Sequence, residues 1–157
     1  MSQYGDRGGY SVQNRPGYPG GRPPQQAQGR PPILRQLDDN YVDTAEAVIK
    51  ALNAVDNRLS NSKLRNLLSM VSDVNNELVR ASSEEIPPGL MNKIRHFRVR
   101  LVFEIGRGDE GVREFARQAD LLRILREDIG NSRAAFLRFA DYMEAMVAYH
   151  RYFSGRD

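Results

Sequence analysis

Residues 92–107 read NKIRHFRVRLVFEIGR, and this stretch indicates the fold class of the chain. One set of its apolar residues recurs at steps of three and four, which places the set on one face of a helix: Ile94, Phe97, Leu101 and Ile105. A second apolar set points away from that face: Val99, Val102 and Phe103. A helix that is apolar on two sides is typically central, or lies between its own core and a partner. The stretch therefore predicts the central helix of an all-α domain.

The polar residues of the same stretch are mainly basic. Three of them are spaced by seven residues, so they form a row along one flank of the apolar face: Lys93, Arg100 and Arg107. Arg95 and Arg98 fall on the opposite flank, and Glu104 is the one acid among these five bases. We therefore predict that this helix contacts an anionic ligand.

Apolar spacing outside this stretch predicts a compact bundle of five to six helices within residues 37–157. Beside the central helix, which should end near Gly106, helices are expected over 43–58, 60–81, 109–129 and 132–154. Asp43 and Glu46 suit a capping box at the start of the first helix. The segment 109–129 is compatible with one bent helix or with two, and Gly130 suits a C-terminal cap.

Residues 1–36 have a different composition. They hold seven of the 13 glycines, six of the eight prolines and five arginines against one acid, so we expect a disordered tail. The fragment YGDRGGY at 4–10 resembles arginine–glycine segments that bind RNA loosely, although a solvated spacer is the simpler interpretation. Residues 37–157 hold 18 bases and 19 acids, so any anion site there requires local clustering of charge.

Several classes of protein are disfavoured by what the sequence lacks. It contains no cysteine, no apolar run near the ~20 residues that span a bilayer, and no signal-peptide core. Its two histidines have no carboxylate at metal-ligand spacing, and no phosphate-binding glycine loop or nucleophile elbow is present. We therefore expect a cytoplasmic protein that is not an enzyme, with no catalytic residues, no metal and no cofactor.

Two further places carry bases where an anion could bind. Lys63 and Arg65 lie in the opening turn of the second expected helix, where exposed amides favour phosphate, although a serine cap with two solvated bases is the plain alternative. In the last helix Arg138 lies on an edge with Tyr142 and Tyr149, which could stack a base or simply cover the core. The physical pattern fits a nucleic-acid-binding subunit or a helical protein-interaction module. A helix-turn-helix regulator is disfavoured, because the central helix is apolar on its outer side.

Three motifs add a resemblance to a known family. The sequences SNSKLRNLLSMV (60–71), HFRVRLVFEIGR (96–107) and YMEAMVAYHRYF (142–153) resemble the small-subunit family of type III-A CRISPR–Cas effector complexes. The likeness covers the folded part in the same order and with similar spacing, and it does not extend to the tail.

The resemblance implies a non-catalytic, all-helical subunit that is present in several copies. The implied partners are guide RNA, target RNA, the backbone subunits, the large cyclase/nuclease subunit and copies of the chain itself. The family motifs make five residues candidate RNA contacts: Lys63, Arg65, Arg98, Arg100 and Arg151. Lys93, Arg107 and Arg138 join them on the residue pattern alone. The alternative function is a helical adaptor whose basic edges bind acidic proteins.

Overall fold

A computed structural model describes residues 33–55 and 59–155, and within these ranges every regular element is a helix. The order is α1 (Tyr41–Ala54), α2 (Asn61–Arg80), α3 (Pro88–Gly106), α4 (Glu110–Gln118), α5 (Leu121–Arg123), the π-helical turn η1 (Ile124–Asp128) and α6 (Arg133–Ser154). The all-α prediction is confirmed. The disordered tail was predicted at residues 1–36. Residues 1–32 of it lie outside the described residues, and residues 33–36 lie within them.

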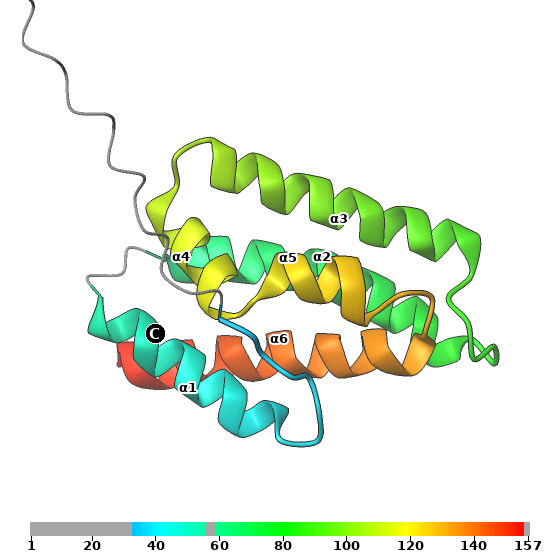
Figure 1. Ribbon diagram of the computed structural model, residues 1–157, viewed down its shortest axis with the longest axis horizontal. Coiled ribbons are helices and arrows are strands. Elements are labelled where there is room, and N and C mark those ends of the chain that lie inside the picture. The colour runs from blue at the N-terminus through cyan, green and yellow to red at the C-terminus, as the bar shows by residue number, and fades with distance from the viewer. Residues whose placement is uncertain (1–32, 56–58, 156–157) are drawn as a thin grey trace, which may run out of the picture. The chain divides into compact units, whose positions relative to one another are not determined.

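The core forms around α6, which packs against both α1 and α2, while α3 packs against α2 and α4 (Figure 1). Phe139 of α6 joins two of these elements, because its ring centroid lies 6.3 Å from that of Phe97 on α3 and 5.8 Å from that of Phe136 on α6 itself. Most of the predicted inner face of α3 is buried: Ile94, Phe97 and Leu101. Ile105 is only partly buried against the core. The outer side of α3 is therefore exposed to solvent, and its apolar residues are on the surface.

Local capping residues begin three of the helices. The side chain of Ser60 accepts a hydrogen bond from the Lys63 amide at 3.3 Å, and Ser132 caps α6 in the same way. Asp109 accepts from the Val112 amide at 3.0 Å and so begins α4. Each such cap contributes about 1 kcal/mol to helix stability.

The start of α1 differs from the prediction. The helix begins at Tyr41 after Asn40, whose side chain makes no capping hydrogen bond, and Asp43 lies inside the first turn. The predicted capping box of Asp43 and Glu46 is therefore wrong. The carboxylate of Asp43 still lies near the positive end of the helix dipole, where a negative charge is favourable.

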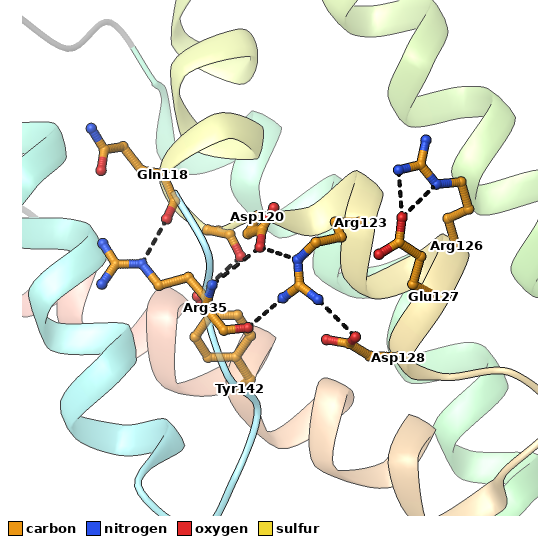
Figure 2. A network of polar contacts seen from close by, with 9 residues as sticks. Arg35, Gln118, Asp120, Arg123, Arg126, Glu127, Asp128 and Tyr142 are labelled. Atoms are coloured by element: carbon orange, nitrogen blue, oxygen red, sulfur yellow. Dashed lines mark hydrogen bonds and ion pairs between the residues drawn. The ribbon is translucent and has the colours of Figure 1, made fainter. Parts of the chain in front are cut away.

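The segment 109–129 is interrupted, which decides between the two alternatives for it. Asp120 adopts a left-handed conformation with φ of 58° and separates α4 from α5. A non-glycine residue in this region is strained unless its neighbours hold it. The Asp120 carboxylate accepts from the Arg35 amide at 3.1 Å and from Arg123 Nε at 2.5 Å (Figure 2).

Arg35 belongs to residues 33–36, which the prediction placed in the tail. Its Nε donates to the carbonyl oxygen of Gln118 at 3.1 Å, and its own carbonyl oxygen accepts from Arg123 at 2.5 Å (Figure 2). This part of the chain therefore lies along the junction between α4 and α5, in the same unit as the helices.

Candidate nucleic-acid interface

A groove of about 650 Å³ runs between α2 and α3. Its polar lining residues come from both helices and from the residue that follows α3: Lys63, Asn66 and Ser69 from α2, His96, Arg100 and Glu104 from α3, and Arg107. The glycine-containing turn that joins α3 to α4 closes one end, since Gly108 and Asp109 line an adjoining hollow together with Lys63 and Arg107. Three of the eight predicted contact residues therefore meet here, although Lys63 lies far from the other two in the sequence.

The cations of the groove are paired with acids that lie deeper. Glu104 accepts from Arg100 at 2.8 Å and from Arg107 at 3.5 Å, and the Lys63 ammonium pairs with Asp109. The acid side chains are 18% and 14% exposed, whereas those of the three bases are 48–61% exposed. A guanidinium has five N–H donors, so each arginine can keep its bond to Glu104 and still bind a phosphate. The groove therefore presents positive charge at its opening.

Asp109 also has a second function. Besides pairing with Lys63 it caps α4, so both the Lys63 ammonium and the Val112 amide hold the pKa of the Asp109 carboxyl below its usual range. The bond to Lys63 is the larger cause. Because of this bond the ammonium of Lys63 is not simply solvated, whereas the alternative interpretation of the opening turn of α2 assumed two solvated bases.

The opening turn of α2 does not present all its amides to a ligand. Ser60 takes the Lys63 amide, so the serine cap of the plain alternative is present. Arg65 is exposed on α2 and does not line the groove.

A smaller notch of about 180 Å³ lies on the opposite flank of α3, where Arg95 and Arg98 face Arg126 of η1. Arg126 pairs with Glu127 at 2.6 Å, whereas Arg98 makes no ion pair within the described part of the chain. Arg98 and Arg100 are thus neighbours in the sequence but lie on different sides of α3. The two arginines therefore do not form a single contact with one segment of a ligand.

The remaining predicted residues lie apart from these two places. Lys93 continues the flank of Arg100 and pairs with Glu77 of α2. Arg138 pairs with Asp39 at 2.8 Å and lines a hollow with Arg35 and Arg123, and Arg151 is exposed near the end of α6. The eight residues therefore do not form a single patch.

Two ring residues of α6 turn out to be part of the core. Tyr142 is fully buried, and its hydroxyl donates to the carbonyl oxygen of Ala119 at 3.2 Å, so the hypothesis that it stacks a base is wrong. Burial raises the pKa of the Tyr142 hydroxyl. His150 is a core histidine with a hydrogen-bond partner: its Nδ1–H donates to the side-chain carbonyl of Asn61 at 2.8 Å, and burial lowers the pKa of its imidazole.

The polar network around Asp120 was missed by the sequence analysis. It joins Arg35 to Gln118 and Arg123, each of which lies more than 80 residues later in the chain (Figure 2). The one local signal is an aspartate between two apolar runs, which fits a break in the segment 109–129 but does not reveal the contacts around it. Its conformation depends on contacts that no short window contains.

These features define a class: a helical domain with a basic groove on its surface. In residues 33–55 and 59–155 no three His, Asp or Glu side chains lie close enough together to hold a metal ion. None of the helices described is both long and apolar enough to cross a membrane.

Comparison with known proteins then assigns the family. A model of the family "Csm2 Type III-A" matches residues 36–156. A Mycobacterium tuberculosis protein described as "CRISPR system Cms protein Csm2" is 40% identical over 123 residues, which cover 77% of this chain and 97% of the relative. A Streptococcus thermophilus protein of the same description is 36% identical over 124 residues, 76% of this chain and 96% of the relative. A protein of the same description from Enterococcus italicus is 26% identical over 98 residues, which cover 62% of this chain and 69% of the relative.

The chain belongs to the Csm2 family of type III-A CRISPR systems. The resemblance seen in its three motifs is thereby confirmed. The predicted class of function is confirmed as well: the chain is a non-catalytic small subunit of the type III-A effector complex. It forms this complex together with other Csm subunits.

Proposed function

We propose that this subunit binds the RNA of the effector complex, guide or target, through phosphate contacts and without reading its sequence. The observation that carries the proposal is the convergence of Lys63, Arg100 and Arg107 on one groove from two helices. Side chains that reach phosphates fix the position of a nucleic acid but do not distinguish its bases. Membership of a CRISPR family makes RNA the polyanion that this groove would meet.

The charges of the groove support a backbone contact. Its acids are the less exposed members of each ion pair, so an approaching phosphate meets the basic members first. Arginine suits this contact, because its planar N–H groups can hold two oxygens of one phosphate. Lys93, on the same flank of α3, would extend the contact along the helix.

The other predicted contacts remain candidates on separate surfaces. Arg98 is the strongest of them, because it shares the notch with two further arginines, Arg95 and Arg126, and makes no ion pair within the described residues. Arg65, Arg138 and Arg151 complete the set. We further propose that the chain acts in the cytoplasm, beside the backbone subunits, the large cyclase/nuclease subunit and copies of itself.

The test is purification of the tagged chain from its host, with half of the sample treated with RNase. Short guide RNAs and the other effector subunits should be recovered together from the untreated half. Recovery of protein partners in both halves, with no RNA in either, would overturn the proposal. It would favour the alternative, a helical adaptor whose basic edges bind acidic proteins.

A further inference from the structure

We propose that Phe103 is a stacking platform for one unpaired base of the RNA; this inference rests on the proposed function and adds a base contact beside the groove. All six phenylalanines lie in the described part of the chain, and Phe103 is the only one of them that is exposed, at 54%. Phe97, Phe115, Phe136 and Phe139 are each at most 2% exposed. The exposed part of this aromatic ring is apolar surface that a ligand can cover.

Two guanidiniums lie close to the ring of Phe103. The Cζ atom of Arg100 lies 5.5 Å from the ring centroid of Phe103, and that of Arg107 lies 5.8 Å from it. Both distances are within the range of a cation–π contact, about 6 Å. The two arginines come three residues before and four residues after Phe103, so all three side chains lie on one side of α3. A base on this ring would have its flanking phosphates within reach of both arginines.

The groove beside the ring also suits the polar parts of a nucleotide. Asn66, Ser69 and His96 line it together with Arg100 and Arg107. Their amide, hydroxyl and imidazole groups can form hydrogen bonds with a base edge or a ribose hydroxyl. The base must be unpaired, because a base inside a duplex already has neighbours on both faces. Stacking on an aromatic ring tolerates any base, which agrees with a contact that does not read sequence.

An apolar protein surface is the competing ligand for Phe103, because Val99 is 62% exposed one turn away on the same helix. The charge of the surroundings favours RNA. Arg100 and Arg107 flank the ring on the side of the groove, and both remain at least half exposed. A purely apolar partner would cover these guanidiniums without offering them an acceptor.

The experiment measures binding of the full-length chain to single-stranded RNA that carries the fluorescent adenine analogue aminopurine. A base that stacks on the ring should lose fluorescence on binding. Phe103→Leu should abolish this quenching and weaken binding by about 5- to 150-fold, the range of one base–aromatic stack. Its salt dependence should not change, because no charge is removed. Phe103→Trp should restore the quenching and the affinity.

Val99→Ala is the matched control, since it shortens a similarly exposed apolar side chain on the same helix. An equal effect of Val99→Ala, or unchanged quenching in Phe103→Leu, would overturn the stacking inference. So would equal affinity for single-stranded RNA and for a duplex. If RNA binding kept its salt dependence in these cases, the proposed phosphate contacts would still hold. Absence of any salt-dependent RNA binding would count against the proposed function instead.

Discussion

Replacing Arg100 and Arg107 together by glutamine removes two of the three cations that line the groove between α2 and α3. Each phosphate contact to a single strand contributes about 0.7 to the slope of log affinity against log salt, so the slope should fall by about 1.4. Over a fourfold change in salt, this difference amounts to about sevenfold in affinity. The variant should therefore bind RNA more weakly than the wild type at low salt, and the two should converge as salt is raised.

The assay is fluorescence anisotropy of a labelled single-stranded RNA over a series of salt concentrations. The matched control is Arg80→Gln with Arg113→Gln, which removes the same charge from exposed residues outside the groove lining. Arg113 is paired with Glu110, so this control also leaves an acid without its base, as the loss of Arg100 does. A slope equal to that of the wild type, or an equal fall in the control, would refute the reasoning.

Three further predictions concern the acid of the groove, the buried histidine and the core. Asp109→Asn keeps a good capping residue for α4 but removes the charge that pairs with Lys63. In the same anisotropy assay the RNA affinity should rise and the salt slope should increase by up to about 0.7. An unchanged slope would mean that Lys63 does not contact RNA. Burial lowers the pKa of His150 in the folded state, so below about pH 6.5 the unfolded state binds more protons than the folded state does. The free energy of unfolding, measured by urea denaturation, should therefore decline as the pH falls from about 6.5 towards the pKa of the folded state. His150→Gln should remove this decline, and an identical pH profile in the variant would contradict the assignment. Leu101→Ala should cost about 2–5 kcal/mol of the free energy of unfolding in urea denaturation, because the side chain is fully buried, and a loss below about 1 kcal/mol would mean that this face of α3 is not part of the core.

The helices could be predicted because their signals are local. Apolar spacing placed Phe97 and Leu101 on the inner face of α3, where both are buried. Ser60 and Asp109 cap helices through hydrogen bonds to amides three residues on, so each signal lies within a single turn. The exposed apolar side of α3 follows from the same periodicity.

Contacts between distant residues could not be predicted in this way. Lys63 and Asp109 are 46 residues apart, and only the packing of α2 beside α3 and the start of α4 joins them. The left-handed Asp120 depends on Arg35, 85 residues earlier in the chain. Neither pair leaves a pattern in a short window.

Tyr142 shows a second limit. Periodicity gives the direction of a side chain around its helix, but the arc that is buried depends on how many neighbours cover that helix. α1 and α2 pack along α6, Phe97 of α3 contacts Phe139, and the hydroxyl of Tyr142 reaches Ala119 at the end of α4. The buried arc of α6 is therefore wider than its apolar stripe. For the same reason the sequence placed Arg98 and Arg100 on different flanks of α3 but could not show which flank borders a groove.

If the groove between α2 and α3 holds RNA phosphates within the effector complex, this subunit should crosslink to RNA there. The contact can be measured by ultraviolet crosslinking of the complex purified from its host, followed by mass spectrometry of the peptides that carry RNA. We expect crosslinked peptides of this subunit from the start of α2 and from α3, including Phe103. Crosslinks confined to other parts of this chain, or found only on other subunits of the same sample, would contradict this expectation.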